Sequence, residues 1–239
     1  YSYDDLDHLT GSLIETSECQ TVLTSYTYDA NGNIKSKKVG NGATTTYTYN
    51  EFSKPTEERI LLVPGDSSKD IVTTYTYDTN NNFTSKTDPR GSTTTYTYDL
   101  YDRLTQVTNP DGSSTTTSYN KDDTIDTVTT YTSSGTILTK TRTLYDGLTH
   151  PTKTITYLDP ANSTGAVETS IVYTRDFEQR QLIDAKNNTT TNSYDTRGNL
   201  TTVTDALGNQ QTTTYNKRDL RTSATTTPTS GNVTTTSYT

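Results

Sequence analysis

Short runs of alternating residues, each ending at a tyrosine, recur along the chain. In the segment 93–98 the sequence reads TTTYTY, so that Tyr96 and Tyr98 fall on the same face of an extended strand. Six residues after most of these terminal tyrosines an apolar residue opens a second run, as Leu104 does after Tyr98. A period of two with no helical period predicts that each unit is a pair of short β-strands.

The terminal tyrosines recur at intervals of roughly 20 to 30 residues, which is the spacing of a repeat protein. Most of them are followed by Asp or Asn. We expect them to be the structural residues of the repeat. They are Tyr3, Tyr28, Tyr49, Tyr77, Tyr98, Tyr119, Tyr145, Tyr173, Tyr194, Tyr215 and Tyr238.

Each unit is expected to contain two turns. The first follows the terminal tyrosine, and the second is typified by the sequences DPRG at 88–91 and NPDG at 109–112, which favour a type I turn closed by a left-handed residue. The apolar positions six and nine residues after the tyrosine have opposite parity, which predicts a β-bulge between them. The residues expected to close the second turn are Gly42, Gly91, Gly112, Asn187 and Gly208.

A longer period lies above the repeat. Superposing Tyr49 on Tyr145 also places Pro55 on Pro151, and these prolines replace the usual apolar residue. We therefore expect one continuous array with three parts. These are two repeats of irregular length at 1–48, a four-repeat superunit at 49–144 and a second superunit at 145–239.

The composition is unusual for an ordered protein, because only 27% of the residues are hydrophobic and 19 of these are Tyr. A low hydrophobic content generally indicates disorder. Thr, however, makes up about a quarter of the chain, and Thr and Tyr both favour a pleated, half-buried surface. We therefore predict an all-β fold of tandem β-hairpins stacked into a spiral or solenoid-like sheet. Its core should be thin and built largely from Tyr rings.

The charge and the remaining side chains exclude several classes of function. A net charge of −8 argues against nucleic acid as a partner. No apolar run approaches the ~20 residues of a membrane-spanning helix. His8, His150 and the single Cys19 form no recognisable nucleophile and base pair, so that we expect no catalytic residue and no cofactor.

Two turns resemble the first half of a calcium-binding loop. They begin at Asp29 and Asp78, but the twelfth position of each loop, Gly40 or Pro89, lacks the bidentate acid that calcium requires. We interpret both as turns first and weak calcium sites second, and we assign no metal. Five asparagines match the N-glycosylation sequon, as chance allows in a Thr-rich chain, and are kept as candidate glycosylation positions. They are Asn82, Asn162, Asn188, Asn199 and Asn232.

The turn sequences resemble the YD repeat of the Rhs family. The resemblance is carried by YDANGNI at 28–34, YDLYDRLT at 98–105 and YDTRGNLT at 194–201, and YDGLTHPT at 145–152 resembles the proline-bearing variant. It extends over essentially the whole chain. The family includes bacterial Rhs toxins, toxin-complex shell subunits, wall-associated proteins and teneurins.

The resemblance implies β-hairpins that spiral into a large hollow shell, which in the toxins encloses a cytotoxic C-terminal domain. This chain departs from that pattern in two ways. It contains far fewer repeats than such a shell needs, and it has no segment resembling the plug, the self-cleaving aspartyl protease core or the non-repeat effector.

Three functions remain open. The first is a non-catalytic structural segment of an extracellular fibre or cell-surface protein. Because the chain starts and stops inside repeats, we expect it to associate with itself or to continue end to end. The second is a shell-wall fragment of an Rhs or toxin-complex toxin enclosing an effector. The third is a carbohydrate or cell-surface binding module that uses exposed Tyr and the long turns 61–70 and 159–168.

Overall fold

Antiparallel β-hairpins make up almost all of the protein. The computed structural model describes residues 1–15 and 21–238, and this part of the chain contains 21 strands and one short 3-10 helix, η1 (Ser67–Lys69). The predicted all-β fold of tandem hairpins is confirmed. Within those residues no helix is long and apolar enough to cross a bilayer.

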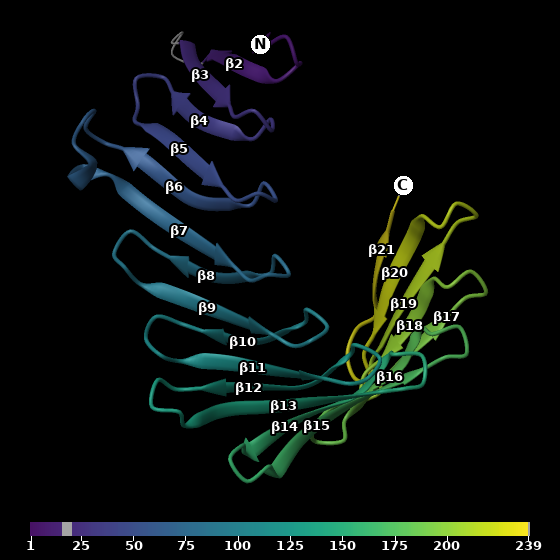
Figure 1. Ribbon diagram of the computed structural model, residues 1–239. Helices are drawn as coiled ribbons and strands as arrows, with labels where there is room; N and C mark the ends of the chain where they lie inside the picture. The colour runs from purple at the N-terminus through teal and green to yellow at the C-terminus, as the bar shows by residue number, and fades with distance from the viewer. Residues whose placement is uncertain (16–20, 239) are drawn as a thin grey trace. The chain divides into compact units, whose positions relative to one another are not determined.

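The first of two compact units covers Tyr1–Thr115. From β1 to β10, each strand is hydrogen-bonded, antiparallel, to the next one (Figure 1, purple to teal). The strands are β1 (Ser2–Tyr3), β2 (Leu9–Glu15), β3 (Thr21–Tyr28), β4 (Ile34–Val39), β5 (Thr44–Tyr49), β6 (Pro55–Leu61), β7 (Ile71–Tyr77), β8 (Phe83–Thr87), β9 (Thr93–Tyr98) and β10 (Leu104–Thr108).

The second unit covers Thr116–Thr239 and repeats the same arrangement. The division falls inside β11 (Ser114–Tyr119), whereas the superunits expected from sequence start at Tyr49 and Tyr145, and those superunits stay a prediction. The remaining strands are β12 (Ile125–Tyr131), β13 (Ile137–Tyr145), β14 (Pro151–Asp159), β15 (Thr164–Tyr173), β16 (Gln179–Ile183), β17 (Thr189–Tyr194), β18 (Leu200–Thr204), β19 (Gln210–Tyr215), β20 (Arg221–Thr227) and β21 (Thr234–Ser237).

A β-bulge follows the terminal tyrosine in one hairpin after another. In β9–β10, Tyr98 lies opposite Leu104 and Thr97 lies opposite Gln106, so that Thr105 is the extra residue. This is the bulge that the change of parity predicts. A bulge increases the local twist and turns a side chain away from the regular face of the sheet. The extra residues of the other bulged pairs are Thr10, Lys35, Thr56, Thr84, Leu138, Thr152, Arg180, Thr201 and Thr222.

The predicted core of tyrosine rings is wrong in one respect. Among the described residues no apolar side chain is buried, and the buried polar side chains are Thr24 and Thr129. Most of the paired strand tyrosines, such as Tyr96 and Tyr98, are instead half-buried. In the first unit Phe83 is the centre of an aromatic cluster, with ring centroids 4.9 to 6.1 Å from those of three tyrosines. They are Tyr75, Tyr77 and Tyr96.

The face opposite these tyrosines carries hydroxyl groups, which accounts for the abundance of Thr. Hydroxyl groups on neighbouring strands are hydrogen-bonded in pairs there. The oxygen–oxygen distances are 2.6 Å for Thr76 and Ser85 and 2.7 Å for Thr214 and Ser223. Such pairs stabilise a sheet while satisfying polar groups that no second layer covers. Across β17 to β21 one complete row is made of hydroxyl residues. They are Ser193, Thr202, Thr212, Thr225 and Thr235.

Candidate functional site

The terminal tyrosines fasten each hairpin to the one before it. The hydroxyl of Tyr98 donates a hydrogen bond of 2.8 Å to the carbonyl oxygen of Phe83, which opens the second strand of the preceding hairpin. Burial raises the pKa of Tyr98, so that the hydroxyl keeps its proton and remains a donor. The same clamp joins Tyr28 to Leu9, Tyr49 to Ile34, Tyr77 to Pro55, Tyr173 to Pro151, Tyr194 to Gln179 and Tyr215 to Leu200.

The other predicted tyrosines occupy the same place in the repeat. Tyr3, Tyr119 and Tyr145 each end a strand, and Tyr238 directly follows β21. The backbone nitrogen of Tyr238 donates to the carbonyl oxygen of Thr222.

Removing one clamp hydroxyl should have a small and measurable cost. We expect Tyr98→Phe to lower the free energy of unfolding by about 1 kcal/mol, because the partly buried carbonyl of Phe83 loses its partner. Urea unfolding followed by tyrosine fluorescence would measure the change. Tyr101→Phe is the control, since Tyr101 is 78% exposed at a turn tip. Equal effects at the two positions would contradict the clamp.

In most of the described repeats, the residue after the terminal tyrosine caps the turn that follows. Asp195 Oδ1 accepts hydrogen bonds from the backbone nitrogens of Arg197 (2.9 Å) and Asn199 (3.0 Å), and Gly198 adopts a φ of 83°. This pattern explains why Asp and Asn follow the tyrosine. Comparable caps in the turns that follow the terminal tyrosines are Asp4, Asp29, Asn50, Asp78, Asp99, Asp146 and Asn216. In the second turns of the repeats, at the other end of the strands, the caps are Asp88, Asp184 and Asp205.

Four of the five predicted turn-closing residues have a positive φ. They are Gly91 (82°), Gly112 (84°), Asn187 (63°) and Gly208 (84°). Gly42 lies in the turn after β4 and donates to the carbonyl oxygen of Val39, but the residue with positive φ in that turn is Gly40.

Sequence reasoning missed one turn of the same kind. Gly135 has a φ of 83°, and the backbone nitrogen of Thr136 donates to the hydroxyl of Thr132. The signal was present, because Tyr131 to Ile137 has the same spacing of Tyr, Gly and Ile as Tyr28 to Ile34. This segment has Thr132 after its tyrosine, where the other repeats mostly have Asp or Asn.

Asparagine side chains connect successive turns. Asn82 Nδ2 lies 2.6 Å from Asp102 Oδ1, and Asn199 Nδ2 lies 2.8 Å from Asp219 Oδ1. Both asparagines belong to sequons, so that a glycan would replace a hydrogen bond between hairpins. The other sequon residues, Asn162, Asn188 and Asn232, are exposed. Glycosylation of the five positions stays a prediction.

The capping hydrogen bonds make stability depend on pH. The side chain and backbone of Asn199, with Arg197 nearby, lower the pKa of Asp195 to about 2. The pKa values of Asp29, Asp184 and Asp205 are lowered as well, in each case first by an asparagine side chain. A depressed pKa stabilises the fold above the unfolded value of 3.8, and this contribution is lost as the pH falls through the folded value.

We therefore expect the midpoint of thermal unfolding to decrease from about pH 5 to about pH 2. Circular dichroism at a series of pH values would measure it. Asp195→Asn provides the comparison, because an amide oxygen can still cap the turn but does not titrate. The variant should lose less stability over this interval than the parent protein. An unchanged acid dependence would show that the caps contribute nothing.

Both histidines belong to contacts between repeats. His8 Nδ1 lies 3.0 Å from Asp4 Oδ2 and its ring stacks on Tyr28, while His150 Nδ1 lies 3.1 Å from Asp146 Oδ2 and its ring stacks on Phe177. Cys19 lies outside the described residues. Within these residues no three His, Cys, Asp or Glu side chains could hold a metal ion together. In both calcium-like turns the first aspartate caps its own turn.

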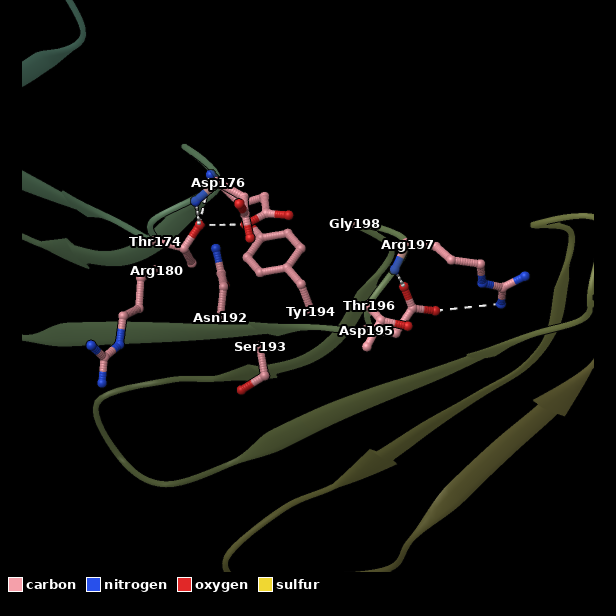
Figure 2. Close-up of a pocket in the computed structure, with 11 residues that line it drawn as sticks. Thr174, Asp176, Arg180, Asn192, Ser193, Tyr194, Asp195, Thr196, Arg197 and Gly198 are labelled. Carbon is pink, nitrogen blue, oxygen red and sulfur yellow. Dashed lines mark hydrogen bonds and ion pairs between the residues drawn. The ribbon is translucent and has the colours of Figure 1, made fainter. Parts of the chain in front are cut away.

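Open grooves lie between neighbouring turns on the tyrosine edge, which is the edge formed by the turns that follow the terminal tyrosines. In the groove of Figure 2, Tyr194 lies between the turn that contains Asp176 and the ion pair of Arg197 with Asp195. Arg197 also lies 2.9 Å from Asp219 of the next turn. The bulge residue Arg180 belongs to the same lining. Such a surface can bind through charge and hydrogen bonds.

The same kind of groove occurs at two further places, one in each unit. One lies between the turns that begin at Asn120 and Asp146, and includes the ion pair of Asp126 with Arg142. The other lies between the turns that begin at Asn50 and Asp78. The repeat thus builds one kind of groove and varies the side chains that line it.

Two segments, residues 77–115 and 194–231, match the RHS Repeat family model. These two segments are similar to RHS repeats. This agrees with the family that the YD sequences indicate, and each matched segment begins at a terminal tyrosine. No protein of curated function matches the chain.

Three solved structures match the chain at low sequence identity and with TM-scores below 0.5. The crystal structure of TcdB2-TccC3 is 14% identical with a TM-score of 0.43, over 99% of this chain and 16% of that one. The Tc holotoxin pore of Photorhabdus luminescens is 11% identical with a TM-score of 0.42, over 94% of this chain and 18% of that one. A porin-like protein from Bacteroides uniformis is 16% identical with a TM-score of 0.35, over 95% of both chains. This chain therefore spans less than a fifth of the length of the Tc proteins that it matches.

Proposed function

We propose that the RHS repeats of this chain are a non-catalytic structural element of an extracellular or cell-surface assembly. A structural role for the repeats agrees with the family. The observation that carries the proposal is the use of the tyrosine hydroxyls. In seven hairpins the hydroxyl of the terminal tyrosine binds the preceding hairpin, so that the most regular polar group of the repeat holds the array together.

The second part of the proposal is self-association through a strand edge. All four residues of β21 are exposed, and the strand is hydrogen-bonded to β20. Exposed edge strands rich in Thr readily pair with another chain. We therefore expect β21 to add a strand from a second copy, and this would extend the array without any new kind of contact.

Sedimentation velocity over a range of protein concentrations tests the self-association. The parent protein should form larger species as the concentration rises, and Thr236→Lys should shift the distribution toward the monomer, because charge on an edge strand opposes pairing. Ser133→Lys is the matched control, since it adds the same charge at an exposed turn, the one between β12 and β13. A parent protein that stays monomeric throughout would refute this part of the proposal.

Electron microscopy of the same samples separates the structural role from the toxin-shell alternative. Strips or filaments that lengthen with concentration would support the proposal. Closed hollow particles would instead favour a shell wall.

A further inference from the structure

One of the three edge grooves differs from the others in carrying an exposed aromatic ring and no cation. It lies between the turns 50–54 and 78–82, and its wall includes Phe52, whose side chain is 58% exposed. The groove of Figure 2 is lined by Arg180 and Arg197, and the third by Lys121 and Arg142. The shared backbone therefore presents different chemistry in this groove than in the two others.

The ring of Phe52 is presented on a fixed turn. Asn50 Oδ1 accepts hydrogen bonds from the backbone nitrogens of Phe52 (3.0 Å) and Lys54 (2.9 Å), and Ser53 adopts a φ of 58°. A turn held in this way fixes the backbone at Phe52 without a ligand, which lowers the entropic cost of ordering the turn when a ligand binds.

The remaining aromatic side chains of the groove are also fixed. The hydroxyl of Tyr77 donates to the carbonyl oxygen of Pro55 at 2.9 Å, and that of Tyr75 donates to Glu58 at 3.4 Å. Both tyrosines line the groove on the side of the second turn. A ligand would therefore meet two tyrosine rings held by hydrogen bonds, beside the ring of Phe52 on a fixed turn.

The polar rim consists of hydrogen-bond acceptors and amides. Glu51 and Asp78 are exposed carboxylates, and the amides of Asn50 and Asn81 meet across the groove at 3.3 Å. Carboxylates accept hydrogen bonds from adjacent hydroxyls, and amides both donate and accept. Two negative charges without a lining cation disfavour phosphates and acidic sugars.

We propose that this groove binds an uncharged pyranose unit of a glycan. The apolar C–H face of the sugar contacts Phe52, while its hydroxyls bind Glu51, Asp78 and Asn81. An aromatic platform beside a few convergent polar groups is the general design of a small-molecule site. The site is separate from the proposed self-association, because no residue of β21 belongs to it.

Nuclear magnetic resonance of the full chain would test this site. Cellohexaose, maltohexaose and chitohexaose would be titrated separately into the ¹⁵N-labelled protein to about 10 mM, where weak binding of one sugar ring is visible. We expect at least one of them to shift the amide signals of residues 50–54 and 75–82. Phe52→Ala should weaken that binding about tenfold, and Phe52→Tyr should retain it.

Tyr101→Ala is the matched control, because Tyr101 occupies the same turn position as Phe52 and the guanidinium carbon of Arg103 lies 5.2 Å from its ring centroid. It should leave the titration unchanged. Three results would overturn the proposal. They are no shifts with any of the three oligosaccharides, equal affinity in Phe52→Ala, and tighter binding of trigalacturonate than of the neutral probes. In each case the sedimentation behaviour stays an independent measurement.

Discussion

Replacing Phe83 by alanine is expected to lower the free energy of unfolding by about 2 kcal/mol, roughly half the cost of removing a fully buried Phe. Phe83 lies opposite Tyr77 across the bulge, and its ring also contacts Tyr75 and Tyr96. Since the sheet has no apolar side chain that is fully buried in the described part of the chain, ring contacts such as these supply much of its apolar contact. Urea unfolding of the variant and the parent protein would measure the difference.

Two further variants test whether the aromatic contacts of Phe83 cause this loss of stability. Phe83→Leu keeps an apolar side chain but loses the aromatic pairs, and should cost about 1 kcal/mol. Ile125→Ala changes the same position of another hairpin, where the side chain is 40% exposed, and should cost less than Phe83→Ala. If the Phe83 and Ile125 variants were equally stable, the aromatic cluster would have no special role.

Gly91→Val is expected to cost about 2 kcal/mol, because a β-branched residue is strained at positive φ. Gly91 has a φ of 82°, and a Cβ atom at this position would meet nothing within 4 Å. The cost therefore comes from the backbone alone. Thermal unfolding and urea titration would both report it.

Gly147→Val is the matched control for Gly91. A Cβ atom there also meets nothing within 4 Å, and the φ of Gly147 lies outside the left-handed range. We expect a change within about 0.5 kcal/mol. Gly91→Asn should fall between the two valine variants, since Asn187 holds the equivalent turn position at a φ of 63°. A similar loss in both valine variants would mean that turn geometry does not limit stability.

The repeat and its turns could be predicted from the sequence because their signals are local. The distance from Tyr98 to Leu104, the parity change and the Asp-Pro-Arg-Gly turn each involve residues close in the chain, and local chemistry decides their geometry. The turn at Gly135 could not be predicted with the same ease, because Thr follows Tyr131 where Asp or Asn follows most terminal tyrosines, and Thr132 caps the turn with a hydroxyl.

The contacts between hairpins could not be predicted in the same way. The clamp from Tyr98 to Phe83 depends on the register of strands from different hairpins, and composition alone does not give that register. The edge grooves depend in addition on where a bulge directs a residue such as Arg180. The degree of burial could not be predicted, because a Tyr-rich strand has the same sequence pattern whether or not a second layer of structure covers it.

The tyrosine clamp also determines how the array unfolds under mechanical force. Each clamp reaches only the preceding hairpin, so the loss of one hairpin removes the support of its neighbour and leaves more distant hairpins intact. A chain pulled from its ends should therefore extend in many small steps, one hairpin at a time, and should recover its length when the tension is released. Toughness would then increase with the number of hairpins, and the force of each step would stay nearly constant.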